Sequence, residues 1–185
     1  REWQRELLRA SCEVEPRLEP ETVSASQRRK GAGGNLACAF TVPGIPVAQG
    51  SKRVVPTRAG PRAIETNEQK LRPWRASVAW EAAAAMGARP LFRGPVQLSL
   101  TFVFPRPKSH FGTGRNADSL KASAPFYVQS KPDLDKLVRA IGDAISGIVV
   151  RDDSEIAHVN AWKVYGYSAQ ARVEVRELVT GAAER

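Results

Sequence analysis

The chain has 185 residues, of which 42% are hydrophobic and 25% are charged, so it can bury the core of one soluble domain. No apolar run approaches the roughly 20 residues that a helix needs to cross a bilayer, which argues against a membrane protein. The formal net charge is +9, and residues 36–132 hold fourteen Lys and Arg against four Asp and Glu. This excess of positive charge predicts a polyanionic partner such as nucleic acid.

Three segments are expected along the chain. Residues 1–35 combine charged residues, Ser and Gly with few apolar residues, which predicts a mobile arm and linker. A folded domain is expected over residues 36–180, followed by a tail over residues 181–185. The two cysteines, Cys12 and Cys38, have no metal-type spacing and are interpreted as reduced thiols of a cytoplasmic protein.

The first half of the domain is expected to contain one strand and one helix. The strand covers residues 36–42, and a loop with Pro and Gly follows, continuing as a basic irregular stretch to residue 62. The helix covers residues 73–86, with Pro73 in its first turn and Gly87 at its end.

The second half begins with the clearest strand, residues 96–104, which alternates apolar and polar side chains. The remaining expected elements are a long loop over 105–130, a helix over 135–146, a short strand over 148–150, and an antiparallel pair over 155–165 and 171–178. These elements predict an α/β fold of the α+β type, with a small mixed or antiparallel sheet and two main helices.

Four carboxylates lie in two short clusters, Asp133 with Asp135 and Asp152 with Asp153, separated by one helix-sized stretch. Acidic clusters in a basic protein favour a metal site that acts on a polyanion, because a divalent cation must separate carboxylates from phosphate. The oxygen donors are suited to Mg²⁺, with Mn²⁺ as a substitute. We therefore predict that the two clusters converge on a metal-dependent active site.

Simpler interpretations of the same residues stay open. An extended Asp133-Leu-Asp135 segment would place both carboxylates on one side, but Asp135 also suits the cap of the following helix. Asp152 and Asp153 are ordinary turn residues. Arg139 lies one helical turn after Asp135, where it either braces that carboxylate or binds a phosphate.

The segment from Lys131 to Arg139, with Gly-Ile-Val-Val-Arg-Asp-Asp-Ser-Glu-Ile156, resembles the core motif of the RusA family of Holliday junction resolvases. The segment Gly44-Ile-Pro-Val-Ala-Gln-Gly-Ser-Lys-Arg53 is similar to the N-terminal signature of that family. The resemblance covers about residues 38 to 178.

The resemblance implies a homodimeric endonuclease, bacterial or phage-encoded, that places symmetric nicks in four-way DNA during recombination and repair. It implies Asp133, Asp135 and Asp153 as catalytic metal ligands, with Asp152 in support. The family commonly has a catalytic Lys where Arg139 stands, which retains a cation but not a proton donor. It often has Asn where Lys136 stands, so Lys136 is a possible substitute cation.

On this interpretation the basic residues hold phosphates of branched DNA. The candidates are Lys52, Arg53, Arg58, Arg62, Arg106, Lys108, Arg115, Lys131 and Lys136. Two alternatives remain: a branched-DNA-binding protein that does not cut, and a metal-dependent glycosyltransferase that uses the Asp-x-Asp pair. The short chain and the lack of an evident nucleotide-binding βαβ unit argue against the second.

Overall fold

The computed structural model describes residues 37–58 and 60–178. The predicted arm over residues 1–35 and the tail over residues 181–185 lie outside these residues, so the division of the chain into three segments stays a prediction. The strands are β1 (Ala37–Pro43), β2 (Lys52–Thr57), β3 (Gly60–Glu65), β4 (Val96–Pro105), β5 (Ile156–Gly166) and β6 (Gln170–Glu177). The helices are α2 (Glu68–Met86) and α3 (Leu134–Ile145), with short 3₁₀ turns η1 (Lys108–His110), η2 (Gly114–Asn116) and η3 (Asp153–Glu155).

The main sheet has four strands in the order β1-β6-β4-β5, in which β4 and β5 are parallel and the other neighbours are antiparallel. A mixed sheet with two main helices confirms the predicted α+β fold. The strands expected near residues 36–42 and 96–104 correspond to β1 and β4.

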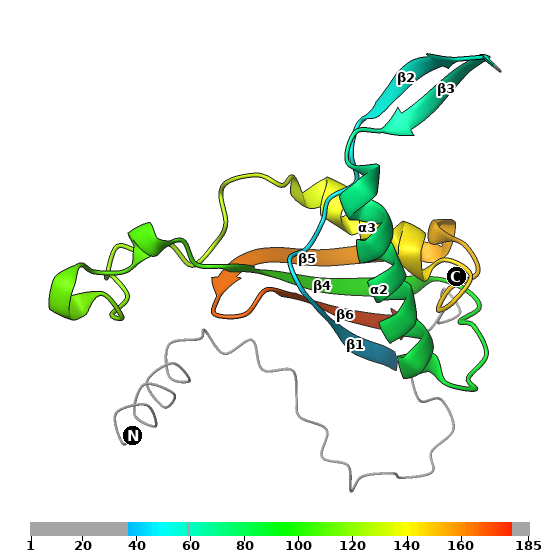
Figure 1. Ribbon diagram of the computed structural model, residues 1–185. Helices are drawn as coiled ribbons and strands as arrows, with labels where there is room; N and C mark the ends of the chain where they lie inside the picture. The colour runs from blue at the N-terminus through cyan, green and yellow to red at the C-terminus, as the bar shows by residue number, and fades with distance from the viewer. Residues whose placement is uncertain (1–36, 59, 179–185) are drawn as a thin grey trace, which may run out of the picture. The chain divides into compact units, whose positions relative to one another are not determined.

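The predicted antiparallel pairing of the last two strands is wrong, because β4 lies between β5 and β6 (Figure 1). The side chains of Val96, Leu98, Leu100 and Phe102 in β4 are almost fully buried. Such a strand is stabilised by neighbours on both sides, whereas β5 has only one buried residue, Val164, and suits the edge. Sequence order alone does not reveal this arrangement.

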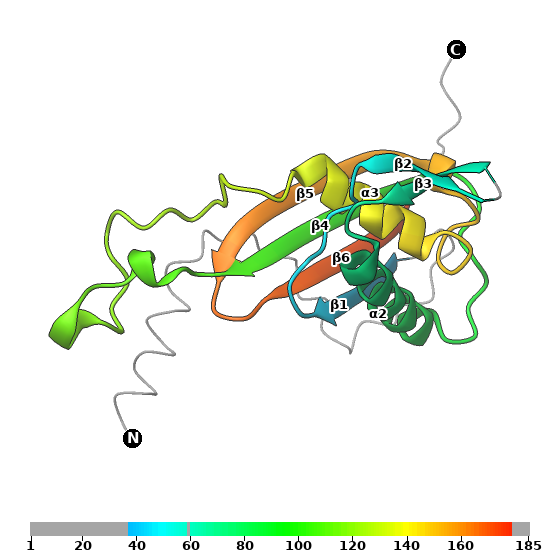
Figure 2. The same cartoon turned by 45° about the horizontal axis from the view of Figure 1, so that its top comes forward.

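Helices α2 and α3 lie on the same face of the main sheet (Figures 1 and 2). They contact each other, and α2 also contacts β1 while α3 contacts β5. The buried residues of α3 recur at helical spacing and form one apolar stripe: Leu137, Ala140, Ile141, Ala144 and Ile145. None of the described helices is long and apolar enough to span a membrane.

Helix α2 begins at Glu68, five residues before the predicted start at Pro73, which lies inside the helix. Leu71 is 1% exposed, so the earlier start adds one more apolar anchor to the buried stripe that includes Trp74 and Val78. This burial offsets the loss of one backbone hydrogen bond at Pro73. The predicted end is correct, since Gly87 follows with a positive φ of 56°.

The prediction of an irregular stretch up to residue 62 is wrong, because β2 and β3 form an antiparallel hairpin. Pro56 and Pro61 are directly paired near its tip. Because proline is rare in strands, these residues led the sequence analysis away from a hairpin. A two-stranded hairpin tolerates proline because both of its strands are edges.

The predicted short strand over residues 148–150 is also wrong, because these residues form a turn after Gly147, whose φ is 78°. Val150 makes only isolated bridges, to Phe92 and Ser146. Val149 and Val150 are fully buried without belonging to a strand, so their apolar character reflects burial rather than pairing.

Candidate active site

The first acidic cluster follows a segment that runs antiparallel along the outer edge of β5. Tyr127 bridges Val164, the N–H of Tyr165 donates to the carbonyl of Phe126 at 2.9 Å, and the N–H of Val128 donates to the carbonyl of Lys163 at 3.0 Å. The end of the long loop is therefore fixed to the sheet just before α3 begins.

The side chain of Lys163 extends this attachment to the residues directly before Asp133. Its Nζ donates to the carbonyl oxygens of Ser130 and Pro132, each at 2.7 Å. The Lys131–Pro132 peptide between these two carbonyls is cis. Lys163 was not expected from the sequence. The feature that distinguishes Lys163 becomes visible only with the strand register. It is a cation paired with the fully buried Phe102, on a sheet face that otherwise carries apolar side chains.

Asp133 occupies the N-cap position of α3 in extended geometry, with φ −68° and ψ 137°. The expectation that Asp135 caps the helix is wrong, since Asp135 lies within the first turn. The Asp133 side chain makes no capping bond and pairs with Lys136, with Oδ2 and Nζ 2.8 Å apart. This hydrogen bond and the charge of Lys136 hold the pKa of Asp133 below its ordinary value of 3.8, and Lys131 and Lys163 act in the same direction.

The Asp133-Leu-Asp135 segment is only partly extended, because α3 already begins at Leu134. Both Asp133 and Asp135 are exposed. The partial positive charge at the N-terminus of a helix attracts negatively charged groups at these two positions. The local structure thus stabilises negative charge where the sequence predicted metal ligands.

The second acidic cluster forms the turn η3. Asp152 caps it and accepts a hydrogen bond from the N–H of Ser154 at 3.0 Å. Hydrogen bonding by the hydroxyl and N–H of Ser154 lowers the pKa of Asp152 from its ordinary value of 3.8. Asp152 therefore has the turn role that the sequence left open, whereas Asp153 is an exposed first residue of η3.

Glu155, which the sequence interpretation did not single out, stabilises this turn. Its carboxylate accepts the backbone N–H of Arg151 at 3.1 Å and forms an ion pair with the guanidinium at 3.3 Å. Its side chain is only 13% exposed. Because η3 contacts α3, the two acidic clusters belong to elements that pack against each other.

The four aspartates have the oxygen donors that Mg²⁺ prefers, and the lowered pKa values of Asp133 and Asp152 keep these two ionised to a lower pH than an ordinary aspartate. Their donor chemistry therefore fits a divalent cation. Within residues 37–58 and 60–178, however, no group of three or more His, Cys, Asp or Glu is arranged to hold a metal ion. The predicted convergence of all four carboxylates thus stays a prediction, and Lys136 already provides one cation to Asp133.

Arg139 and Lys131 are exposed beside the first cluster. No described carboxylate forms an ion pair with Arg139, so the structure does not support bracing of Asp135. A phosphate contact is the interpretation that remains for Arg139. Lys136, unlike Arg139, forms an ion pair with a described carboxylate, because its ammonium is bound to Asp133.

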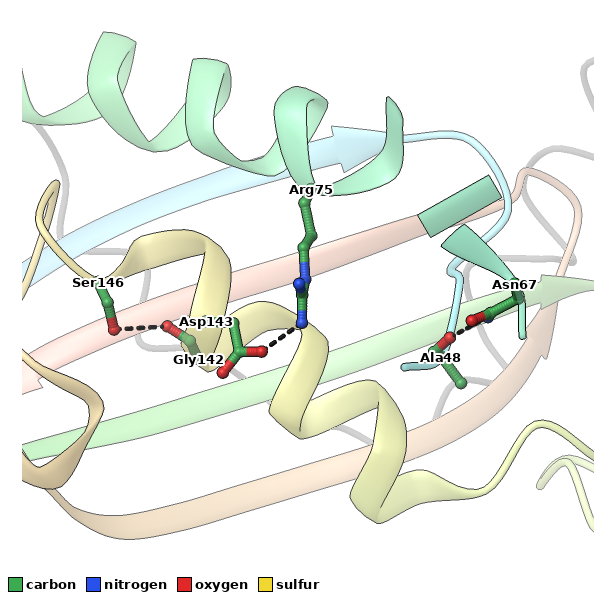
Figure 3. A network of polar contacts seen from close by, with 6 residues as sticks. All are labelled: Ala48, Asn67, Arg75, Gly142, Asp143 and Ser146. Atoms are coloured by element: carbon green, nitrogen blue, oxygen red, sulfur yellow. Dashed lines mark hydrogen bonds and ion pairs between the residues drawn. The ribbon is translucent and has the colours of Figure 1, made fainter. Parts of the chain in front are cut away.

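Four of the predicted DNA-binding cations lie in the β2–β3 hairpin or its turn: Lys52, Arg53, Arg58 and Arg62. The base of this hairpin is joined by a bond from the N–H of Thr66 to the carbonyl of Ser51 at 3.2 Å. Asn67 Nδ2 donates to the carbonyl of Ala48 at 2.5 Å (Figure 3). The N–H of Gln49 donates to the carbonyl of Lys136 at 3.0 Å, so the base of the hairpin adjoins the first turn of α3.

The remaining predicted cations belong to the long loop. Lys108 and Arg115 are exposed in η1 and η2. Arg106 instead packs its guanidinium over the ring of Tyr165, 5.8 Å from the centroid, and donates to the carbonyl of Pro125 at 2.9 Å. Arg106 thus holds the two ends of the loop together, a structural role that the sequence did not indicate.

Comparisons with known proteins agree with this description. The family profile described as endodeoxyribonuclease RusA matches residues 43–176, which include both acidic clusters. A relative from Bacillus subtilis (strain 168), the uncharacterized protein YqaN, is 27% identical over 144 residues, which cover 75% of this chain and 95% of the relative.

Proposed function

The chain belongs to the RusA family of endodeoxyribonucleases, and from this premise we propose that it resolves Holliday junctions by paired, symmetric nicks. The observation that carries the proposal is the contact between α3 and η3, because these two neighbouring elements carry the two acidic clusters within the region that matches the family. Recombination and repair of DNA are the processes in which this activity would act.

The proposal assigns Asp133, Asp135 and Asp153 as ligands of Mg²⁺ or Mn²⁺, with Asp152 in support. When bound, such an ion polarises the scissile phosphate and lowers the pKa of an attacking water. Lys136 pairs with Asp133 in the free protein, and its release from Asp133 would free that carboxylate for a metal ion. Lys131 and Arg139, both exposed beside the acidic cluster, would contact phosphates of the bound strand.

A homodimer suits this function because a four-way junction has approximate twofold symmetry and two strands to be cut. One site per subunit would then face each strand. The exposed cations Arg58, Lys108 and Arg115, with the hairpin residues Lys52, Arg53 and Arg62, are proposed to hold the junction arms. Light scattering of the free protein and of its junction complex tests the subunit number.

A second candidate is a protein that binds branched DNA without cutting it. Two observations favour it: Arg139 stands where the resemblance implies a catalytic Lys, and the described residues contain no group of three metal-binding side chains. No observation favours the glycosyltransferase alternative.

The deciding experiment is cleavage of a synthetic four-way junction and a matched linear duplex in Mg²⁺, Mn²⁺ or EDTA. We expect paired nicks across the branch point that require metal and are absent from the duplex. Asp133→Asn and Asp135→Asn should each lower the cleavage rate by more than about 100-fold while junction binding persists, since loss of outer-sphere partners alone costs about 10–100-fold.

Asp118→Asn is the matched control, because Asp118 is an exposed aspartate of the long loop outside both acidic clusters. It should cut at the wild-type rate. Tight junction binding by the wild type without any cutting would favour the non-cleaving alternative. Cleavage by Asp133→Asn at the wild-type rate would remove the assignment of the active site.

A further inference from the structure

Lys163 has an unusual position for a lysine of an edge strand. It pairs with Phe102 in the β4–β5 register and is only partly exposed, and no described carboxylate forms an ion pair with it. Its ammonium instead donates to two backbone carbonyls, those of Ser130 and Pro132, at 2.7 Å each. A partly buried charge is costly unless hydrogen-bonded, so these two bonds determine where the ammonium lies.

The two carbonyls lie one and three residues before Asp133. A loop segment next to an exposed helix end is normally free to move, because few backbone hydrogen bonds restrain it. Here the backbone bond from Val128 to Lys163 and the two side-chain bonds attach residues 128–132 to a single position of β5. Movement of Asp133 relative to the sheet would require at least one of these bonds to break.

Lys163 bonds to the backbone before Asp133 and forms no ion pair with its carboxylate. The ammonium of Lys136, by contrast, pairs directly with that carboxylate and competes with any other cation there. Lys163 therefore acts on the position of Asp133 without occupying its oxygens.

We propose that Lys163 is a positioning residue of the nuclease site, which fixes the backbone before Asp133 and so sets the place of that carboxylate. This inference rests on the proposed function. It differs from a phosphate-binding role, because two of the three N–H donors of the ammonium are already used by Ser130 and Pro132. A phosphate contact would control junction affinity, whereas a positioning role controls the cleavage step.

The test compares Lys163→Met, which keeps an unbranched side chain only one atom shorter but removes every donor, with Lys163→Arg, which keeps a cation with several donors. Lys121→Met is the matched control, because Lys121 Nζ also donates to a backbone carbonyl, that of Ser109 at 2.9 Å, within the long loop. Three quantities are measured: hydrogen exchange of the peptide spanning residues 129–137, Mn²⁺ binding by electron paramagnetic resonance, and junction binding and cleavage.

For Lys163→Met we expect cleavage at saturating junction to fall about 10–100-fold and Mn²⁺ affinity to fall about 10-fold, as for the loss of outer-sphere partners. Exchange in residues 129–137 should accelerate, while junction affinity stays within about twofold and Lys163→Arg restores most of the cleavage rate. Lys121→Met should change none of these quantities at the acidic cluster.

Unchanged exchange or unchanged Mn²⁺ affinity in Lys163→Met would overturn the inference, as would a loss confined to junction affinity. If Lys163→Met fails to fold, Lys163→Gln decides, because its shorter side chain can reach at most part of the bonding and should lose more cleavage and exchange protection than Lys163→Arg. A wild-type protein that never cuts junctions refutes the proposed function, while the exchange and Mn²⁺ measurements still judge the role of Lys163.

Discussion

The contact between the two helices offers a quantitative test of what holds α3 in place. Arg75 of α2 forms a hydrogen-bonded ion pair with Asp143 of α3, although the residues are 68 positions apart in the chain (Figure 3). Their side chains are 29% and 32% exposed, so the pair is neither fully solvated nor buried. Replacement by Arg75→Met and Asp143→Asn, singly and together, isolates the interaction energy.

The expected magnitude lies between two limits. Fully exposed ion pairs contribute about 0.2–1 kcal/mol, and hydrogen bonds to charged groups contribute about 1.5–3 kcal/mol when shielded from water. With about a third of each side chain still exposed, we expect a coupling energy of about 1 kcal/mol. For a chain of this length, each kcal/mol corresponds to a fall of about 2–4 °C in Tm.

The assay is a double-mutant cycle on the free energy of unfolding in urea, at low salt and in about 1 M NaCl, where screening should reduce the coupling. The ion pair between Arg176 and Glu174 is the control. Its atoms are 2.7 Å apart, but its side chains are 52% and 36% exposed on a single strand. It should show less than about 0.5 kcal/mol. A coupling for Arg75 and Asp143 below about 0.3 kcal/mol, or one insensitive to salt, would refute the reasoning.

Two further predictions concern the acidic cluster and the core. Lys136→Met should raise the pKa of Asp133 toward 3.8, measured by NMR titration of its carboxyl carbon, and Lys131→Met should raise it less, because Lys131 acts only through its charge. Since the folded-state pKa of Asp133 is lowered, the stabilising effect of Lys136 should be present above about pH 4 and vanish as the pH falls through the lowered pKa. An equal loss of stability in Lys136→Met at acid and at neutral pH would contradict this. Trp74, 6% exposed, and Trp80, 76% exposed, lie on the same helix. Trp74→Ala should cost about 3–5 kcal/mol in urea unfolding and Trp80→Ala less than about 0.5 kcal/mol, and similar losses would contradict the assigned burial.

Much of the fold could be predicted from local patterns. The alternation in residues 96–104 predicted β4, and the apolar spacing from Leu137 to Ile145 predicted α3, because periodicity depends only on neighbours in the chain. The hairpin was missed because Pro56 and Pro61 hide its strands, and the start of α2 was missed because Pro73 resembles a first-turn residue.

For the candidate site too, the sequence predicted some features and missed others. The sequence alone was sufficient to recognise the motif of the family whose profile matches residues 43–176. The roles of the two acidic clusters and of Arg139 stay predictions. The sequence could not assign partners, so Lys136 was interpreted as a DNA contact although it pairs with Asp133, and Arg106 as another although it packs on Tyr165.

Only the tertiary structure decided which strands are neighbours and which side chains meet at the start of α3. Since β4 occupies one edge of β5, residues 126–128 pair with its other edge, and Lys163 comes to lie beside the segment before Asp133, about thirty residues away in the chain. Residue patterns predict the burial and periodicity of a segment, because these depend on the residues of that segment alone. Strand pairing depends on which of several distant segments packs best beside a given strand, so it is decided only in the complete fold.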